Sequence, residues 1–455
     1  MDLKLLAKYS QPGPRYTSYP PAPHFSETFG PAYWQDELIQ SQDATRPISL
    51  YLHIPFCDTL CYYCGCNMVA TANYAKAEQY LAYLMAEIDR VAALTDRGRE
   101  VAQMHWGGGT PTYLHPNDIR RLATHIHKRF HFAPDAEVGV EVDPRGLTQD
   151  HVIALRESGF NRASLGVQDL DETVQKSVNR VQSLALIEEV YGWFRHGGFE
   201  SINLDLMTGL PHQTLETYRV TLAEIIRLNP DRLAIFGYAH VPWLKKHQKL
   251  ILESDLPNFE ARMAMQEFIL ETLEGVGYVH IGMDHFAKPA DSLVEAQRNK
   301  SLWRNFQGYT THRNVDIYAF GASAISQTET TYAQNEKRVA TYQSKIDRGE
   351  LATERGYRLS RDDRIRRDVI TELMCDLELT KDTIARRWSI DFDTYFADSL
   401  KAMVPLEQDG LVKASKAVIQ VKPLGRLFLR NIAMCFDAYL KKKGDQVGAR
   451  YSKTA

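Results

Sequence analysis

Residues 48–67 of the chain read ISLYLHIPFCDTLCYYCGCN. The stretch begins with an apolar, strand-like run and ends in a dense group of thiols. Four of the six cysteines in the chain lie within ten residues of one another: Cys57, Cys61, Cys64 and Cys66. A random scatter of six cysteines over 455 residues would almost never produce such a group. We therefore expect the loop that follows the strand to carry metal or redox chemistry.

The composition is that of an ordinary globular chain, with 44% apolar and 24% charged residues and a formal net charge of −3. A general binder of polyanions would be basic, so binding of bulk nucleic acid is disfavoured. The sequence contains no run of eighteen apolar residues, and its start lacks the apolar core of a signal peptide. We therefore expect a cytoplasmic protein without a membrane span, in which thiols stay reduced.

Three kinds of site use clustered thiols. Disulfides fit poorly, because the compartment is reducing and the short spacings strain the geometry of a bridge. Structural zinc usually takes its ligands from two separated knuckles, and no second Cys/His knuckle follows here. An iron–sulfur cluster fits best, since closely spaced thiolates on one loop can hold the corners of a cubane. The remaining cysteines, Cys375 and Cys435, stand in apolar, helix-like contexts and are interpreted as buried small side chains.

The spacing Cys57-x3-Cys61-x2-Cys64 resembles the signature of the radical S-adenosylmethionine (radical SAM) superfamily. The resemblance implies that these cysteines hold three irons of a [4Fe–4S] cluster, and that the fourth iron binds the amino and carboxylate groups of S-adenosylmethionine. One electron then splits the sulfonium into methionine and a 5′-deoxyadenosyl radical. Three ligands for four irons leave a coordination vacancy, and a vacancy permits chemistry.

Short β-like segments alternate with helix-like segments along the chain. The β-like segments are Ile48–Ile54, Met104–Gly107, Glu137–Val142, Arg162–Gln168, Ser201–Leu206 and Arg232–Tyr238. The helix-like segments are Ala75–Leu94, Asn117–Phe130, Gln149–Ser158, Leu184–His196 and Leu215–Leu228. This alternation predicts an α/β fold with a parallel sheet. Six such units fit the partial (β/α)6 barrel of the radical SAM superfamily, although periodicity alone does not separate it from a doubly wound sheet.

Polar residues share one face in three of the predicted strands and alternate there with aliphatic residues. The polar pairs are Tyr51 with His53, Glu141 with Asp143, and Asn203 with Asp205. We expect these residues to line the lumen of a barrel that holds a polar ligand, with helices covering the aliphatic side.

The run HWGGGTPTYL (residues 105–114) follows the second predicted strand. Adjacent glycines let the backbone approach a ligand closely, although a tight strand–helix turn is the simpler interpretation of the run by itself. Beside the cysteine loop, the run resembles the glycine motif of the radical SAM superfamily, which contacts the methionine moiety.

Further motifs narrow the resemblance. They are EVDPR, FNRASLGVQD, NLDLMTGLP, GMDHFA, NFQGYTT, GASAIS and RNIAMCFDAYL. With the two runs above, they are similar to the family of oxygen-independent coproporphyrinogen III oxidases (dehydrogenases) over nearly the whole chain. A related haem-chaperone branch typically has Phe at the position of Cys66 and lacks much of the N-terminal arm. The presence of Cys66 and of RYTSYP (residues 15–20) favours the oxidases.

The resemblance assigns roles to individual residues. It implies cluster ligation by Cys57, Cys61 and Cys64, with Cys66 beside the substrate or a second S-adenosylmethionine. The first S-adenosylmethionine would contact Tyr51, Gly108, Glu141, Ala239 and Ile325. The second would contact Tyr63, Gly109, Thr110, Gln168, Arg180 and Asp205. Phe306 and Gln307 are implied on the substrate side, and His53 joins the site because it shares a strand face with Tyr51 next to the cysteine loop.

The implied reaction is oxidative decarboxylation of two propionates of coproporphyrinogen III to the vinyl groups of protoporphyrinogen IX. A substrate with four carboxylates needs cations, for which Arg15, Arg304 and Arg313 are candidates. A one-electron reductant such as flavodoxin or ferredoxin is the expected partner of a monomeric enzyme. The alternative is a haem-binding or haem-delivery protein on the same scaffold, without turnover.

We expect three parts along the chain. Residues 1–35 form an arm over the mouth of the barrel, residues 36–354 the barrel, and residues 355–455 a mainly helical domain. In the last part, helices at Arg361–Leu377 and Lys381–Trp388 precede a small hairpin, an order that resembles a winged helix. With the basic tail Lys441–Lys443 this order fits a DNA reader, but a domain that caps the barrel is the favoured interpretation.

Overall fold

A computed structural model of the chain describes residues 3–43, 45–440, 451, 452 and 454. The chain divides into two units, each made of segments that are distant in sequence. The large unit comprises Ser26–Ile269 and Asn314–Tyr357. The small unit comprises Met1–Phe25, Leu270–Arg313 and Arg358–Ala455. These units follow different boundaries from the expected division at residues 35 and 354, which stays a prediction about functional parts.

The core of the large unit is a run of six parallel strands. They are β1 (Ile48–Ile54), β4 (Glu100–Gly108), β5 (His131–Val142), β6 (Arg162–Gln168), β7 (Ser201–Thr208) and β8 (Arg232–Gly237). Each strand pairs in parallel with the next one along the chain. A doubly wound sheet would reverse its strand order at a switch point, whereas this order runs in one direction throughout. The strand order therefore confirms the partial (β/α)6 barrel.

Further strands extend the sheet beyond β1. β13 (Asp316–Phe320) pairs in parallel with β1, and β14 (Ile325–Gln327) and β15 (Thr331–Asn335) continue it in antiparallel fashion. β16 (Thr353–Arg358) lies next to β15. A separate parallel pair joins β2 (Phe56–Cys57) to β3 (Val69–Ala70).

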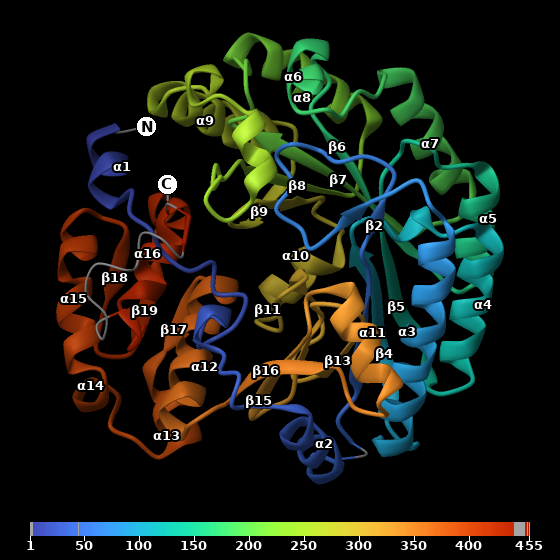
Figure 1. Ribbon diagram of the computed structural model, residues 1–455. Coiled ribbons are helices and arrows are strands. Elements are labelled where there is room, and N and C mark those ends of the chain that lie inside the picture. The colour runs from blue at the N-terminus through green and yellow to red at the C-terminus, as the bar shows by residue number, and fades with distance from the viewer. Residues whose placement is uncertain (1–2, 44, 441–450, 453, 455) are drawn as a thin grey trace. The chain divides into compact units, whose positions relative to one another are not determined.

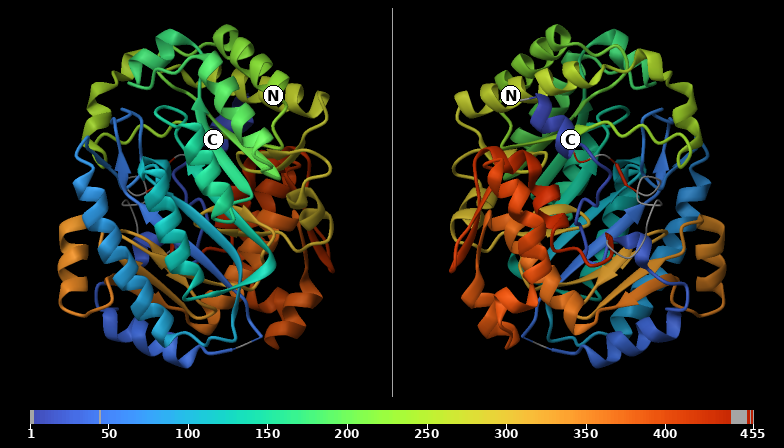
Figure 2. Two further views of the ribbon diagram at one scale, coloured as in Figure 1. Left: turned by 90° about the vertical axis from the view of Figure 1, so that its right-hand side faces the viewer. Right: turned by 90° about the vertical axis from the view of Figure 1, so that its left-hand side faces the viewer.

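Helices connect the parallel strands and cover their outer side (Figures 1 and 2). They are α3 (Ala75–Leu94), α4 (Pro116–His127), α5 (Gln149–Glu157), α6 (Glu172–Ser177), α7 (Leu184–His196) and α8 (Leu215–Leu228). The large unit also contains α2 (Pro31–Gln40), α11 (Val339–Asp347), η2 (Pro111–Tyr113), η3 (Lys246–Leu250) and η4 (Glu253–Asp255). On β1 the aliphatic side chains of Leu50, Leu52 and Ile54 are fully buried, as the alternation predicts.

Most predicted bounds agree with the structure. β1, β6, α3, α7 and α8 have the predicted ends. β4 and β5 begin earlier, at Glu100 and His131, than the predicted Met104 and Glu137. The first half of β5 is largely exposed and contains Pro134, so it has no apolar alternation by which a strand could be recognised.

The small unit combines short antiparallel pairs with helices. Its strands are β9 (Val279–Gly282), β10 (His285–Ala287), β11 (Trp303–Asn305), β12 (Gly308–Thr310), β17 (Glu378–Thr380), β18 (Val412–Ala414) and β19 (Val418–Val421). Its helices are α1 (Leu3–Tyr9), η1 (Ala22–His24), α10 (Ser292–Arg298), α12 (Arg361–Asp376), α13 (Lys381–Trp388), α14 (Phe392–Tyr395), α15 (Ala397–Gln408), η5 (Leu424–Phe428) and α16 (Leu429–Met434). The unit boundary falls within α9 (Phe259–Gly275).

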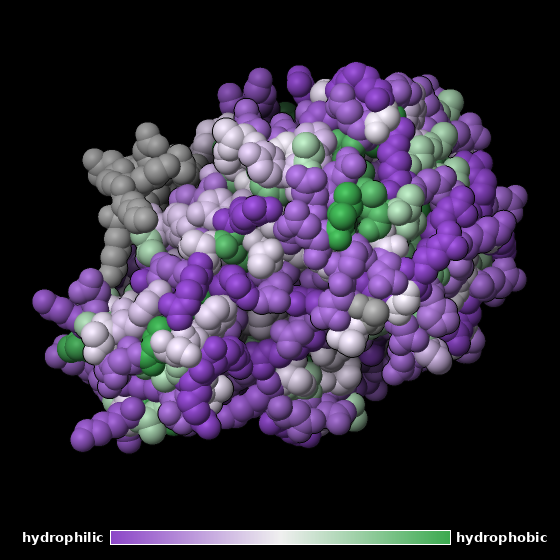
Figure 3. Space-filling view, turned by 90° about the horizontal axis from the view of Figure 1, so that it is seen from below, coloured by the Kyte–Doolittle hydropathy of each residue, from purple (hydrophilic) through white to green (hydrophobic). Residues whose placement is uncertain are grey.

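The C-terminal part of the small unit has the predicted order of helices followed by a hairpin. β18 and β19 form the hairpin, and β17 pairs with β19 to complete a three-stranded sheet. The tail Lys441–Lys443 lies outside the described residues. The face drawn in Figure 3 is mostly hydrophilic, with hydrophobic residues in small separate groups. Among the helices that the structure describes, none has the length and apolar character needed to cross a membrane.

Candidate active site

The cysteine loop follows β1 and includes the short strand β2. Cys61 is buried, Cys57 and Cys64 are half-buried, Cys66 is exposed, and all four are free thiols. Burial raises the pKa of Cys57 to about 12, and the charges of Cys64 and Cys61 act on it in the same direction. Hydrogen bonds from the thiol and the N–H of Cys66 lower the pKa of Cys64 to about 6. The three predicted ligands therefore lie within electrostatic range of one another.

Side chains from far along the chain hold the loop by its backbone carbonyls. Just after β8, in and beside η3, Lys245 Nζ donates to Cys66 O at 2.9 Å, His247 Nε2 to Cys64 O at 2.7 Å and Gln248 Nε2 to Tyr63 O at 2.9 Å. On another side of the loop, Asn179 Nδ2 donates to Leu60 O at 2.9 Å. None of these residues is predicted from the sequence, because no local pattern connects them to the cysteines.

Two arginines lie against the sulfur of Cys61. Arg145 Nη2 is 3.4 Å and Arg180 Nη1 is 3.5 Å from Cys61 Sγ. Both also donate to Asp143 Oδ2, at 2.7 and 3.0 Å. Although burial opposes ionisation, Arg180 and Arg145 hold the pKa of Asp143 below its usual value. Two guanidiniums and one carboxylate therefore surround this sulfur.

Of these two arginines, only Arg180 was predicted as a site residue. Arg145 was missed, although it ends the EVDPR motif two residues after Asp143. The sequence signal was an acidic residue followed two positions later by a basic residue, directly after a strand that faces the lumen. This signal could have predicted the ion pair of Asp143 and Arg145.

The glycine motif is hydrogen-bonded to the cysteine loop. Gly109 N donates to Ile54 O at 2.8 Å, Thr110 N to Phe56 O at 2.9 Å, and Thr110 Oγ1 lies 3.5 Å from Cys57 Sγ. Gly108 has a φ of +124°, and a Cβ there would lie 2.8 Å from Ile54 O. Only glycine allows this approach, so the motif brings backbone amides next to the thiols.

Glu141 lies beside this glycine turn. Its Oε2 accepts from Gly108 N at 3.1 Å, and its Oε1 lies 3.3 Å from His105 Nε2. Burial opposes its ionisation, but the hydrogen bond and charge of His105 and the Gly108 N–H keep the pKa of Glu141 below its usual value. Glu141 is therefore an ionised acceptor at the C-terminal end of β5.

Tyr51 and His53 occupy the inner face of β1, as predicted. The ring of Tyr51 stacks on His105 with centroids 6.2 Å apart, and its hydroxyl lies 3.2 Å from His53 Nδ1. His53 Nε2 donates to Asn67 O at 2.8 Å, so its Nδ1 accepts from Tyr51. Burial lowers the pKa of His53, so its ring is neutral.

Asp205 lies on β7 among polar partners. Ser164 Oγ donates to its Oδ2 at 2.8 Å and Asn203 Nδ2 to its Oδ1 at 2.7 Å. Burial, together with the charge of Glu141, raises the pKa of Asp205 to about 6. The inner faces of β5 and β7 thus carry interacting carboxylates, as the strand alternation predicts.

The remaining predicted residues divide between the two units. In the large unit, Gln168 ends β6 with a φ of +68°, Ala239 follows β8, and Ile325 begins β14. Phe306 and Gln307 form the turn between β11 and β12 in the small unit, where the ring of Phe306 packs edge-on against Phe25. Their place relative to the cysteine loop stays a prediction.

Cys375 is fully buried, as interpreted from the sequence, but Cys435 is only half-buried. The interpretation of Cys435 was wrong because this residue is the C-cap of α16 and lies beyond the buried residues of that helix, the last of which is Ala433.

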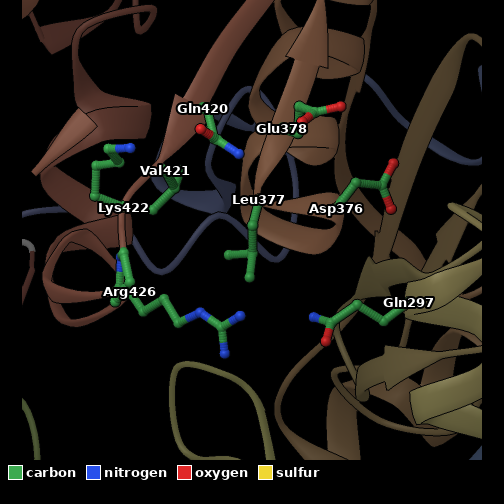
Figure 4. Close-up of a pocket in the computed structure, with 9 residues that line it drawn as sticks. Gln297, Asp376, Leu377, Glu378, Gln420, Val421, Lys422 and Arg426 are labelled. Atoms are coloured by element: carbon green, nitrogen blue, oxygen red, sulfur yellow. The ribbon is translucent and has the colours of Figure 1, made fainter. Parts of the chain in front are cut away.

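A pocket of about 340 Å³ lies in the small unit (Figure 4). It is lined by Gln297, Asp376, Leu377, Glu378, Gln420, Val421, Lys422, Pro423 and Arg426. None of these residues is a predicted site residue, and the lining carries both signs of charge. Among the described residues, no group of three or more His, Cys, Asp or Glu side chains is arranged to hold a single metal ion.

Comparisons with known proteins identify the family. A family model described as the radical SAM superfamily matches residues 51–225, and one described as the HemN C-terminal domain matches residues 359–428. The chain is 47% identical over 442 residues to the oxygen-independent coproporphyrinogen III oxidase of Salmonella typhimurium, covering 97% of this chain and 96% of that protein. It is 44% identical over 447 residues to the enzyme of that name from Synechocystis, with the same shares covered.

A solved structure agrees as well. The coproporphyrinogen III oxidase HemN from Escherichia coli, described as a radical SAM enzyme, matches with a TM-score of 0.92 and 46% identity over 96% of this chain and 99% of that chain. Membership of the superfamily implies a [4Fe–4S] cluster and S-adenosylmethionine as cofactors. Because whole-length identity, fold and cysteine loop agree, the chain belongs to the oxygen-independent coproporphyrinogen III oxidases, oxidoreductases of the radical SAM superfamily.

Proposed function

We propose that this protein catalyses the oxygen-independent oxidative decarboxylation of two propionate side chains of coproporphyrinogen III, giving the vinyl groups of protoporphyrinogen IX. The observation that carries the proposal is the contact between the cysteine loop and the glycine motif, through Gly109 N, Thr110 N and Thr110 Oγ1. The amides of this turn are bonded within the protein and hold the turn against the loop. The ionised carboxylate of Glu141, whose charge acts on Cys66, is the acceptor that this arrangement offers to a polar ligand beside the thiols.

The residues present fit the implied cofactors. Closely spaced thiols suit iron–sulfur ligation, and the sulfur of Cys61 lies within hydrogen-bonding distance of two guanidiniums. We assign the three ligands to Cys57, Cys61 and Cys64. When bound, the cluster and S-adenosylmethionine together supply a carbon radical that can abstract a hydrogen atom from a propionate chain.

The first S-adenosylmethionine is assigned to Tyr51, Gly108, Glu141, Ala239 and Ile325. Glu141 is suited to an ammonium group or a ribose diol, because an ionised carboxylate only accepts hydrogen bonds. Its orientation is held by Gly108 N and His105. His53 accepts from the Tyr51 hydroxyl and acts as a positioning residue, since abstraction of a hydrogen atom requires no general base.

A second S-adenosylmethionine is assigned to Tyr63, Gly109, Thr110, Gln168, Arg180 and Asp205. Within the described residues, Arg180 Nε is buried without a hydrogen-bond partner, while its two Nη atoms bind Asp143 and Gly166 O. A carboxylate would satisfy this remaining donor. The substrate side is assigned to Cys66, Phe306 and Gln307. We further propose a monomeric, cytoplasmic enzyme reduced by a one-electron donor such as flavodoxin or ferredoxin.

An anaerobic turnover assay tests the proposal. The chain is reconstituted with iron and sulfide and given S-adenosylmethionine, a reductant and coproporphyrinogen III. Formation of both 5′-deoxyadenosine and protoporphyrinogen IX is the expected result. Because the last step to the vinyl group releases one electron, the assay also contains a one-electron acceptor. With that acceptor present, formation of 5′-deoxyadenosine without a porphyrin product would contradict the substrate. Absence of both, with tight binding of haem, would favour a haem-delivery protein instead.

A further inference from the structure

The three arginines that the sequence singles out as carboxylate candidates all lie in the small unit, and their surroundings differ. Arg304 is on β11 and is only 6% exposed. Its Nε lies 3.4 Å from Arg15 O, and its guanidinium lies 4.7 Å from the centre of the Tyr309 ring. Among the residues that the structure describes, its Nη1 has no hydrogen-bond partner. A buried guanidinium with an unused donor is costly unless a ligand completes it.

Arg15 brings a second guanidinium to the same place. Its side chain is 36% exposed and pairs with Asp284 through Nη2. Asp284 also feels the charge of Arg304: burial opposes its ionisation, but Arg15, His285 and Arg304 keep its pKa below the usual value. The carboxylate of Asp284 is thus the counter-charge of two guanidiniums. Because Arg15 is partly exposed, a ligand can reach it from solvent.

A third guanidinium increases the excess of positive charge. Arg430 is buried and donates through Nε to Pro14 O at 3.1 Å and through Nη2 to Ser452 O at 2.9 Å. Burial and the charges of Arg15 and Arg304 lower the pKa of Arg430 to about 9. Because backbone carbonyls accept the hydrogen bonds of Arg430, this residue adds positive charge near Arg15 and Arg304 but is not a donor to the ligand. The single negative charge of Asp284 cannot neutralise the three guanidiniums.

Arg313 has a balanced environment in contrast. Its Nη1 donates to Lys300 O at 2.8 Å, its Nη2 lies 3.9 Å from Asp376 Oδ2, and its guanidinium lies over the Trp303 ring. The nearby Glu372 also senses its charge. Two acidic neighbours compensate this arginine, which makes it a matched control.

From these contacts we propose that Arg304 and Arg15 form a subsite for one carboxylate of the substrate, with Arg304 Nη1 as the central donor and Asp284 as an internal competitor for Arg15. The inference rests on the proposed function, because a propionate of the porphyrinogen is the carboxylate in question. A planar guanidinium fork matches a carboxylate in geometry as well as in charge.

Binding of a non-reacting analogue tests the subsite. The reconstituted full-length protein is titrated anaerobically with coproporphyrin III and with its uncharged tetramethyl ester, and both affinities are followed by porphyrin fluorescence. The wild type should bind the acid more tightly than the ester. Arg304→Gln should lose on the order of tenfold in affinity for the acid and little for the ester, because only the acid uses the guanidinium. Arg313→Gln should keep both affinities.

Asp284→Asn supplies a test that a merely structural role would not pass. Removing the competing carboxylate frees Arg15, so affinity for the acid should rise while affinity for the ester stays unchanged. Arg15→Gln serves as a second loss variant if Arg304→Gln fails to fold, as judged by circular dichroism.

The inference is overturned if a folded Arg304→Gln or Arg15→Gln binds the acid like the wild type, or if Arg313→Gln loses as much affinity as they do. A wild type that binds neither porphyrin contradicts the proposed substrate itself. The two failures are therefore distinguishable.

Discussion

At the scale of single residues, the environment of each thiol separates the cysteines of the loop. Cys61 lies against Arg145 and Arg180, Cys57 beside Thr110, and Cys64 accepts a hydrogen bond from the N–H of Cys66. Cys66 is the exposed member of the group. These differences support three ligands and one thiol with another role, and they can be tested one residue at a time.

We expect Cys57→Ser, Cys61→Ser and Cys64→Ser each to abolish cluster assembly, because a hydroxyl is a poor ligand for iron in a cluster. Cys66→Ser should keep the iron and lose turnover. Iron and sulfide content after reconstitution measures both effects, and Cys435→Ser serves as the control with full iron.

Full iron in any of the first three variants would refute the ligand assignment. Loss of iron in Cys66→Ser would make that residue a ligand, and stoichiometric zinc in place of iron would favour a structural metal site.

A second residue-scale prediction concerns Gly108. Its φ of +124° and the 2.8 Å separation between a Cβ and Ile54 O make Gly108→Ala strained. We expect a loss of about 1–3 kcal/mol in the free energy of unfolding, measured in urea, and weaker binding of S-adenosylmethionine. Gly275→Ala is the control, because that position is open and helical, and its effect should be about 1 kcal/mol or less. Equal stability of the two variants would contradict the claim that the close approach of Gly108 to Ile54 O requires glycine.

At the scale of elements, η3 and the residues beside it hold the cysteine loop from outside the sheet. Lys245, His247 and Gln248 contact carbonyls that are 179 to 185 residues earlier in the chain. Gln248 is only 1% exposed and also accepts from Val241 N at 2.6 Å. A single amide thus connects two loops, each of which would otherwise have an unsatisfied polar group.

Removal of this amide should make the cysteine loop less stable. We expect Gln248→Ala to cost about 1–3 kcal/mol of stability, because two partly buried backbone groups, Tyr63 O and Val241 N, lose their partner. Iron should be lost faster to a chelator than from the wild type. The exposed neighbour Lys249→Ala is the control and should match the wild type in both measurements. An unchanged rate of iron loss in Gln248→Ala would show that η3 does not hold the loop.

At the scale of the whole molecule, one buried carboxylate connects several elements of the large unit. Glu87 on α3 accepts from Gly321 N at 2.7 Å, Asn335 Nδ2 at 2.6 Å and Tyr342 on α11 at 2.7 Å. Burial raises its pKa to about 7 despite these hydrogen bonds. The folded state therefore binds a proton at Glu87 more tightly than the unfolded chain does.

This linkage gives stability a pH dependence. Because the folded pKa is raised, the contribution of Glu87 is fully present below its unfolded pKa of about 4.5 and is lost as pH rises through about 7. Urea unfolding at pH 5 and pH 8 measures the difference, which should be of order 3 kcal/mol from this group. Glu87→Gln should remove that part of the slope. A slope that the substitution leaves unchanged would assign the effect to other groups.

Much of the fold was predictable because the pattern of apolar residues within an element shows which of its faces is buried. The period-two alternation on β1 and the apolar stripes of α3, α7 and α8 gave the right bounds, since each element shows its buried face within its own residues. β5 was too short in the prediction because its first half contains no buried residue and so shows no such pattern. β4 was too short because its buried face includes Gln103, a polar residue that does not signal burial in the sequence. The inward placement of Tyr51, Glu141 and Asp205 was predictable for the same reason.

The sequence by itself determined the order of strands and helices, the loop of thiols and the glycine motif, because each of these is a local pattern. Only the tertiary structure decided that Arg145 and Arg180 converge on Cys61 and that His247 holds Cys64. It also decided that Arg304 has an unused donor among the described residues while Arg313 has acidic neighbours. These contacts join residues as far as 183 positions apart, and a hydrogen bond over that separation depends on how the chain folds back on itself. No local periodicity encodes it.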